Sequence, residues 1–127
     1  MIAVDDPMVG VGVALHTLIV EDDRVSRESL ARILQLKGFQ VRGVETLAGG
    51  FSALAFRPRC VILDLMLPDG RGTTLLKKIR DERLPIRVAI VTGADVPLID
   101  EARAFGPDEV FAKPVDLPRL LAWLQAA

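Results

Sequence analysis

Short apolar runs alternate along this chain with longer segments in which apolar residues recur every three or four positions. Short runs are typical of buried strands, and the longer spacing is typical of helices that pack one face against a sheet. The apolar runs predict five strands, at residues 15–20, 39–44, 60–65, 86–91 and 109–112. The helical spacing and the capping residues predict five helices: from Asp23 or Ser26 to Lys37, over 46–56, over 73–83, from Asp95 to Phe105, and from Asp116 onward.

The regular alternation of strand and helix indicates the fold class. Strands that are apolar throughout are buried on both faces, so they belong to a parallel sheet with helices on each side. We therefore expect an α/β fold with a doubly wound, five-stranded parallel sheet in the flavodoxin-like strand order 2-1-3-4-5. In that order the first and third strands are neighbours, and the direction of winding reverses between them. Ligands of such sheets bind there, outside the carboxyl ends of the strands.

Charged residues stand where three of the predicted strands end. Glu21 and Asp22 follow the first strand, Asp64 lies near the end of the third, and Lys113 follows the last. Parallel strands bring their carboxyl ends to one edge of a sheet, so we expect these three carboxylates and one ammonium group to converge. Clustered carboxylates repel one another unless a cation is present. The residues therefore predict a Mg²⁺ site that handles a phosphoryl group.

Composition and charge narrow the function further. The chain has 127 residues, enough for one domain, and a net charge of −1 without a basic stripe, so we expect no direct binding of nucleic acid. A single cysteine, Cys60, allows no internal disulfide and indicates a reducing, cytoplasmic location. Residues 1–14 form a predicted N-terminal extension. Its apolar part is too short to span a membrane and lacks the basic start of a signal peptide.

Four short segments stand at predicted strand ends: LIVEDD at 18–23, VILDLMLPDG at 61–70, VTG at 91–93 and FAKP at 111–114. Each segment alone is a weak signal, but the four in this order are highly specific. Together they make residues 15–126 resemble the receiver domain of bacterial two-component response regulators. We place the predicted receiver domain at residues 15–127.

The resemblance implies a phosphoacceptor in two-component signal transduction rather than an ordinary enzyme. By this resemblance, Asp64 takes a phosphoryl group from a histidine kinase or a phosphotransfer protein. Thr92 then hydrogen-bonds the phosphoryl group and Lys113 pairs with it. Four groups are implied as ligands of Mg²⁺: Glu21, Asp22, Asp64 and the backbone carbonyl of Met66. Such a domain promotes its own phosphoryl transfer and its own slow dephosphorylation.

One position departs from the family pattern. Many receivers carry Tyr or Phe three residues before the lysine, where this chain has Val110, followed by Phe111. Neighbouring residues of a strand point to opposite faces, so Phe111 cannot take the place of that ring. We expect the signal to leave the site mainly through the loop 92–95 and the helix that follows it.

Other interpretations stay open on the sequence alone. A phosphatase of the haloacid-dehalogenase type needs a second aspartate where this chain has Met66. A flavodoxin-like flavin binder needs a Ser/Thr/Gly-rich loop where this chain has residues 21–23, which are acidic. The main alternative is a receiver-like adapter that is never phosphorylated.

We expect the signal to be read by a downstream protein or by an output domain outside this chain. Both arrangements are compatible with a homodimer.

Several residues also have structural explanations that require no chemistry. Asp22 and Asp23 can serve as helix caps, and Asp64 can begin a turn. We expect Asp69 and Gly70 to form a turn rather than to take part in catalysis, and His16 to have a structural or surface role.

Overall fold

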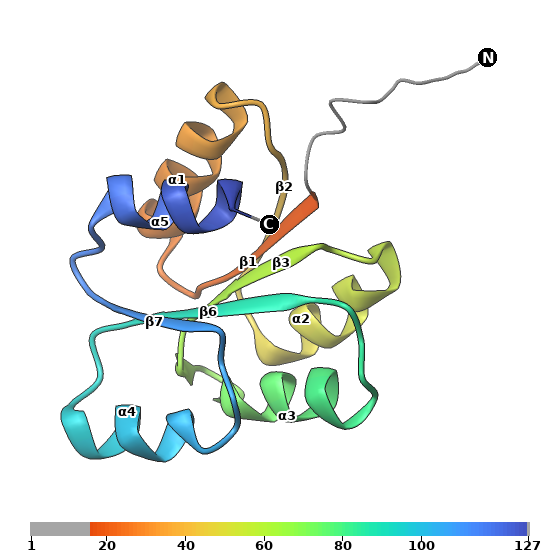
Figure 1. The fold of residues 1–127 in the computed structure, drawn as a ribbon, viewed down its shortest axis with the longest axis vertical. Coiled ribbons are helices and arrows are strands. Elements are labelled where there is room, and N and C mark those ends of the chain that lie inside the picture. Colours follow the sequence, from red (N-terminus) through yellow and green to blue (C-terminus); the bar gives the residue numbers. More distant parts are fainter. Residues whose placement is uncertain (1–15, 127) are drawn as a thin grey trace.

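The computed structural model describes residues 16–126, and its centre is one five-stranded parallel sheet (Figure 1). The strands are β1 (His16–Val20), β2 (Gln40–Val44), β3 (Cys60–Leu63), β6 (Arg87–Thr92) and β7 (Glu109–Ala112). They lie in the order β2-β1-β3-β6-β7, and every neighbouring pair is parallel. Counted as five strands, this is the order 2-1-3-4-5, and the predicted fold class is confirmed. The predicted extension at 1–14 and the predicted strand start at Leu15 lie outside the described residues.

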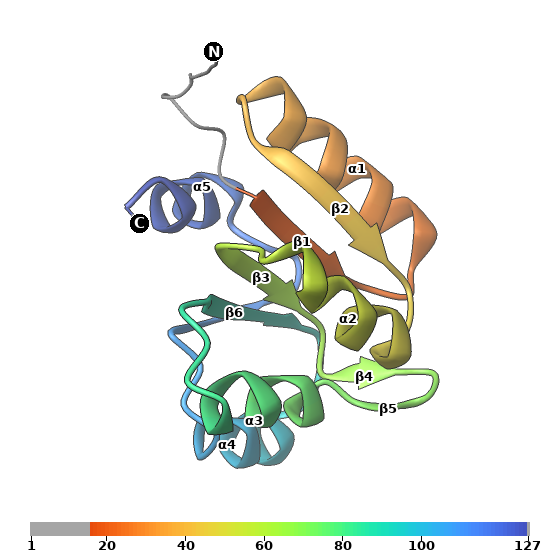
Figure 2. The ribbon, with the colours of Figure 1, turned by 90° about the vertical axis from the view of Figure 1, so that its right-hand side faces the viewer.

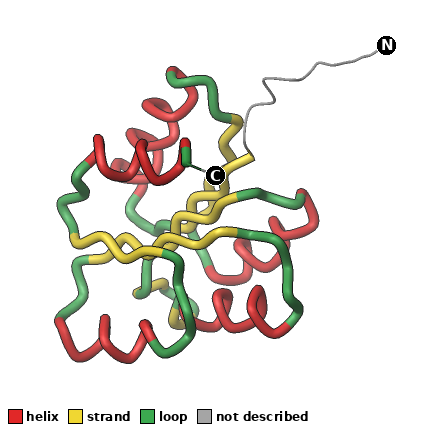
Figure 3. The backbone as a smooth tube through the Cα atoms, viewed as in Figure 1, coloured by secondary structure: helices red, strands yellow, loops and turns green. Residues whose placement is uncertain are grey.

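Helices cover both faces of the sheet. They are α1 (Arg24–Leu36), α2 (Leu47–Ala53) with a following 3₁₀ turn (Leu54–Phe56), α3 (Thr73–Asp81), α4 (Val96–Arg103) and α5 (Leu117–Gln125). Figure 1 shows α1 and α5 on one face, and α2, α3 and α4 on the other. Figure 3 shows the same three layers, with the strands between the helices. Within residues 16–126, no helix has the length and apolar character that a membrane crossing requires.

Two apolar layers form because strand side chains alternate between the two faces of the sheet. The layer under α2, α3 and α4 includes Leu63 and Leu76, and the layer under α1 and α5 includes Ile62 and Leu120. Burial on both faces explains why the strands are apolar along their length. Apart from Arg42 in the exposed edge strand β2, charged groups of the sheet therefore stand at the strand ends.

Local side chains begin four of the five helices. Each accepts a hydrogen bond from a free N–H of the first turn, and they are Asp23, Thr46, Asp95 and Asp116. Of the two candidates for α1, Asp23 is the cap, and it accepts the N–H of Ser26 at 2.9 Å. Helix α3 has no such cap and begins directly after Gly72.

Several predicted boundaries were wrong by one to three residues. The strand predicted over 60–65 ends at Leu63, although the N–H of Asp64 still donates to the carbonyl of Val20 at 3.0 Å. The helix predicted over 73–83 ends at Asp81, and Arg83 then has a positive φ of 54°. The helix predicted over 46–56 is divided into α2 and the 3₁₀ turn. Helices α1 and α4 end before the predicted Lys37 and Phe105. Strands β2 and β6 begin one residue after the predicted Phe39 and Ile86, and β6 extends one residue further than predicted, to Thr92.

A small antiparallel hairpin after β3 was not predicted. Its strands are β4 (Met66–Leu67) and β5 (Gly70–Arg71), joined by a turn at Pro68 and Asp69. Figure 2 shows the hairpin beyond the carboxyl ends of the parallel strands, next to α2. Strands of two residues are too short to show a periodic pattern, so the sequence indicated only a turn here.

Gly72 closes the chain back onto Asp64. A Cβ atom at this position would lie 2.1 Å from the backbone carbonyl oxygen of Asp64 and 3.1 Å from Cγ of Leu63. The N–H of Gly72 also donates to the carbonyl of Leu65 at 2.8 Å. Only a residue without a side chain fits, so this glycine fixes the path of the loop that follows β3.

Gly72→Ala is expected to destabilise the fold by about 1–3 kcal/mol or more, because the added methyl group has to displace backbone rather than a flexible side chain. Urea unfolding gives the free energy of unfolding. Gly93→Ala is the matched control, because a Cβ there meets only Cβ of Lys113, at 4.0 Å. Equal stability of the two variants would contradict the steric explanation.

Candidate functional site

Three carboxylates meet at the carboxyl ends of β1 and β3. Glu21 and Asp22 follow β1, and Asp64 follows β3, whose Leu63 is in register with Val20 of β1. One carboxylate oxygen from each lies within 4.8 Å of the others. Glu21 and Asp64 are each 7% exposed, whereas Asp22 is exposed. The parallel pairing thus brings together carboxylates that are 43 positions apart in the chain, from 21 to 64.

Lys113, directly after β7, brings positive charge to this cluster. Its Nζ lies 2.8 Å from Oδ2 of Asp64 and 2.5 Å from Oε1 of Glu21. The Lys113 side chain is 32% exposed, and the two carboxylate side chains are 9% exposed. Three carboxylates face one ammonium group, so the cluster as it stands has an excess of negative charge.

The surroundings of the ion pairs of Lys113 raise the pKa of both Glu21 and Lys113. Burial raises the pKa of Glu21, and the nearby Asp64 charge adds to this, although the hydrogen bond from Lys113 opposes it. Burial disfavours the charged form of Lys113, but its hydrogen bonds to Asp64 and Glu21 outweigh that effect and raise its pKa. Lys113 therefore keeps its charge at neutral pH. The raised pKa of Glu21 follows chiefly from its burial.

Both oxygens of the Asp64 carboxylate have partners. The Thr92 hydroxyl, at the end of β6, donates to Oδ1 at 3.2 Å, and the N–H of Met66 donates to the same oxygen at 3.2 Å. Lys113 donates to Oδ2. The Thr92 hydroxyl in turn accepts the N–H of Ala94 at 3.1 Å. Asp64 is thus held by donors from three separate segments that meet at the carboxyl edge of the sheet.

The donor set fits a small divalent cation. Carboxylate and carbonyl oxygens are the ligands that Mg²⁺ prefers, and the carboxylates of Glu21, Asp22 and Asp64 are close enough to surround one ion. The excess negative charge of the cluster favours cation binding. Bound Mg²⁺ would be held by these carboxylates and the backbone of Met66, and would supply charge neutralisation for an incoming phosphoryl group.

Two residues near the site had no predicted role in it. The guanidinium group of Arg27 donates to the backbone carbonyl of Glu21 at 2.8 Å, which holds the turn after β1. Asp69, expected only to form a turn, also accepts backbone N–H groups of α2. The sequence carries no signal for either contact, because a side chain that binds a distant backbone group leaves no periodic pattern.

A cleft of about 610 Å³ leads to the cluster between α1 and α5. Glu21, Asp64 and Lys113 line one end, and apolar side chains such as Leu30 and Ile33 of α1 line the wall. The cluster is therefore open to a reactant from outside, although two of its carboxylates are buried.

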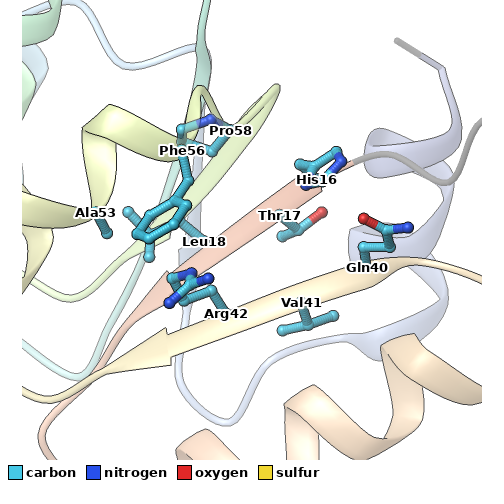
Figure 4. Close-up of a pocket in the computed structure, with 9 residues that line it drawn as sticks. All are labelled: His16, Thr17, Leu18, Gln40, Val41, Arg42, Ala53, Phe56 and Pro58. Atoms are coloured by element: carbon cyan, nitrogen blue, oxygen red, sulfur yellow. The ribbon is translucent and has the colours of Figure 1, made fainter.

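A second hollow of about 190 Å³ lies at the opposite edge, near the amino ends of β1 and β2 (Figure 4). His16, Gln40 and Arg42 line it together with the 3₁₀ turn, and the guanidinium carbon of Arg42 lies 3.6 Å from the ring centroid of Phe56. None of its lining residues is acidic, so it lacks the ligands of a Mg²⁺ site.

Val110 and Phe111 face opposite sides of the sheet, as expected from their adjacent positions on β7. Val110 packs against the layer of α2, α3 and α4, and Phe111 is buried, 3% exposed, in the layer of α1 and α5. Arg119 of α5 stacks over Phe111, with its guanidinium carbon 5.2 Å from the ring centroid. The ring of Phe111 therefore packs on the face of the sheet opposite to that of Val110.

Comparison with known proteins agrees with the geometry of the site. The family model of the response regulator receiver domain matches residues 17–125. This chain belongs to that family. Receiver domains are signalling phosphoacceptors, not classical enzymes, and bind Mg²⁺ at an acidic pocket. In this receiver domain the acidic cluster of Glu21, Asp22 and Asp64 corresponds to such a pocket.

Individual relatives show how far the similarity extends. The receiver domain is 32% identical to the transcriptional regulatory protein FixJ of Bradyrhizobium diazoefficiens over 88% of this chain but only 56% of FixJ. A response regulator receiver protein from Pseudomonas putida, known from its crystal structure, is 28% identical in sequence to this receiver domain. The two structures superpose with a TM-score of 0.84, over 92% of this chain and 100% of that one. The chain therefore spans about half the length of FixJ and the whole of the receiver protein.

A third relative was crystallised in a chemically modified state. It is a response regulator protein from Burkholderia pseudomallei with a phosphorylated aspartic acid, a calcium ion and citrate. The receiver domain is 27% identical to it, with a TM-score of 0.76 over 85% of this chain and 65% of that one.

Asp22→Asn is expected to stabilise the receiver domain by about 1 kcal/mol in the absence of divalent ions, because it removes one of three mutually repelling charges. Urea unfolding in a chelator measures the difference. Glu45→Gln, which removes an exposed carboxylate that does not belong to the cluster, serves as the control and should have little effect. A less stable Asp22→Asn variant would show that repulsion does not dominate the cluster.

Proposed function

We propose that this receiver domain accepts a phosphoryl group on Asp64 in a Mg²⁺-dependent reaction. The observation that carries the proposal is the arrangement around Asp64: its carboxylate lies beside Glu21 and Asp22, and it is contacted by Thr92 and Lys113. The Burkholderia pseudomallei relative, with its phosphorylated aspartic acid and calcium ion, supports the same chemistry for this chain.

In this reaction an oxygen of Asp64 forms a bond to phosphorus while the bond from phosphorus to the donor breaks. Like charges oppose the approach of a carboxylate to a phosphoryl group, so positive charge near the reacting atoms is required. Lys113, already 2.8 Å from Oδ2 of Asp64, supplies an ammonium group for the phosphoryl oxygens. The Thr92 hydroxyl supplies a hydrogen-bond donor on the other side of the carboxylate.

Mg²⁺ is assigned to Glu21, Asp22, Asp64 and the backbone carbonyl of Met66, with Asp22 as the main direct ligand. Glu21 is engaged by Lys113, whereas Asp22 is exposed, so Asp22 is freer to bind an ion. Mg²⁺ commonly takes one or two carboxylates together with waters and phosphate oxygens, which this donor set allows.

The partners are assigned by chemistry and by family. The phosphoryl donor is a histidine kinase or a phosphotransfer protein, whose side chain reaches Asp64 through the cleft between α1 and α5. The signal is read by a downstream protein or by an output domain outside this chain. The match to this chain covers only 56% of the length of FixJ, so both arrangements agree with it. A cytoplasmic location remains a prediction.

Treatment with acetyl phosphate and Mg²⁺ is expected to add one base-labile phosphoryl group to the protein, with acetate as the leaving group. Intact mass spectrometry measures the addition. Asp64→Asn should abolish it, because the amide is a poor nucleophile of similar shape, and Asp100→Asn, an exposed control, should label normally. Labelling of Asp64→Asn would refute the assignment of the nucleophile. No labelling of the native protein would favour the unphosphorylated adapter.

Loss of the phosphoryl group is expected to be slow. In this family, the residues two positions after the aspartate and two positions after the threonine flank the path of the attacking water, and here they are Met66 and Ala94. Met66 is 52% exposed and its side chain offers only a weak acceptor, and the Ala94 side chain offers no hydrogen-bonding group.

Met66→Asn is therefore expected to accelerate dephosphorylation, because the amide can orient a water molecule. The rate is measured as the decay of phosphorylated protein after removal of the donor. Met66→Leu, a variant of similar size without hydrogen-bonding groups, is the control and should decay as slowly as the native protein. An unchanged or slower decay in Met66→Asn would show that this side chain does not control the water.

A further inference from the structure

Asp69, at the tip of the β4–β5 hairpin, has a fully engaged carboxylate although it is exposed. Its Oδ1 accepts the N–H of Leu47 at 2.7 Å, and its Oδ2 accepts the N–H of Ala48 at 2.9 Å. These partners are 22 and 21 positions away in the chain. The hydrogen bonds from Ala48 and Leu47 lower the pKa of Asp69, which keeps the group ionised and able to accept both.

The start of α2 is completed by one local and one distant side chain. The first turn of a helix leaves N–H groups without partners inside the helix. Here the N–H of Gly49 donates to the Thr46 hydroxyl at 2.9 Å, and those of Leu47 and Ala48 donate to Asp69. Thr46 and Asp69 thus provide the same kind of contact for α2, but only Asp69 links the helix to the hairpin.

The start of α2 is also joined to the end of β1, which carries the acidic pair. The N–H of Glu21 donates to the carbonyl of Val44 at 3.0 Å, two residues before Thr46. Gly50, in the first turns of α2, lies beside β1, where a Cβ would be in ordinary van der Waals contact with Val20, 3.5 Å from its Cγ2. The position of α2 is therefore coupled to the position of Glu21.

The base of the hairpin is joined to the phosphoacceptor. The N–H of Met66 donates to Oδ1 of Asp64 at 3.2 Å, and Gly72 packs against the carbonyl of Asp64. The hairpin therefore bridges the site: its base is at Asp64 and its tip, through Asp69, is at the helix attached to the acidic pair.

We propose that Asp69 is a positioning residue for the Mg²⁺ site. By tying the hairpin to α2, it fixes the spacing between the Met66 backbone and the end of β1 that carries Glu21 and Asp22. This inference rests on the proposed Mg²⁺-dependent function of that site. Without the tie, the hairpin loses its hydrogen bonds to α2 and keeps only the packing of Leu67 on the core and the exposed ion pair of Arg71 with Glu101. The Met66 carbonyl then has to be ordered when the ion binds, which weakens binding.

The test compares Asp69→Ala with Thr46→Ala in the full chain, using calorimetric titration with MgCl₂ and thermal unfolding. Both variants lose a cap of α2, so both should unfold at a similarly lowered temperature. Mg²⁺ affinity should fall about ten-fold in Asp69→Ala, as for groups that orient metal ligands, and should stay near the native value in Thr46→Ala. Native-like affinity in Asp69→Ala, or an equal loss in both variants, would overturn the proposal.

Loss of a negative charge is controlled separately with Glu45→Gln. Glu45 is exposed and stands next to Thr46, so this variant removes a carboxylate near the start of α2 while leaving the Asp69 contacts in place. Its Mg²⁺ affinity should match the native value. A ten-fold loss in Glu45→Gln would assign the effect to net charge and overturn the positioning role.

Amide hydrogen exchange distinguishes a positioning role of Asp69 from a role limited to capping α2. Coupling between two sites is reciprocal, so Mg²⁺ binding should slow exchange at the N–H groups of Leu47 and Ala48 in the native protein. This slowing should be absent in Asp69→Ala and kept in Thr46→Ala. Slowing that persists in Asp69→Ala would show that the ion reaches α2 by another route.

Failure of the inference and failure of the proposed function give different results. If the native protein binds no Mg²⁺, or if Asp22→Asn binds it equally well, the proposed metal site is wrong and the inference fails with it. If the native protein binds Mg²⁺, Asp22→Asn weakens binding and Asp69→Ala does not, the function stands and only the role of Asp69 is refuted.

Discussion

The paired hydrogen bonds from Lys113 to Glu21 and Asp64 are the interaction on which the site depends. Two carboxylates with so little exposure repel each other and lose hydration, and the ammonium group offsets both effects. The contact also joins the ends of β1, β3 and β7, which are far apart in the chain. The charges that suit the site for phosphoryl chemistry therefore also hold its edge of the sheet together.

Much of this arrangement could be predicted because it follows from periodicity. Apolar runs separated by amphipathic helices require a parallel sheet, and a parallel sheet places all strand ends on one edge. Glu21, Asp64 and Lys113 needed only to stand at strand ends to be brought together, although Lys113 is 92 positions from Glu21 and 49 from Asp64. Small errors in the strand boundaries, such as the end at Leu63 instead of Leu65, do not change which edge a residue reaches.

The parts that escaped prediction are those set by single contacts. The β4–β5 hairpin is held by a turn, by the close approach of Gly72 to Asp64, and by the bonds of Asp69 to α2. None of these produces a repeating pattern in the sequence. The role of Arg27 is of the same kind, since its partner is a backbone carbonyl. Such contacts refine the position of atoms within a site whose location is already decided by the sheet.

The Thr92 hydroxyl has a further consequence, because it is shared. It gives its single proton to Asp64 and accepts the N–H of Ala94. A change at Asp64 that draws this hydroxyl away therefore also removes the partner of the Ala94 N–H, in the loop before α4. Phe111 is packed in the layer of α1 and α5 under Arg119, so the Thr92 side chain provides the link between the Asp64 carboxylate and the backbone just before α4.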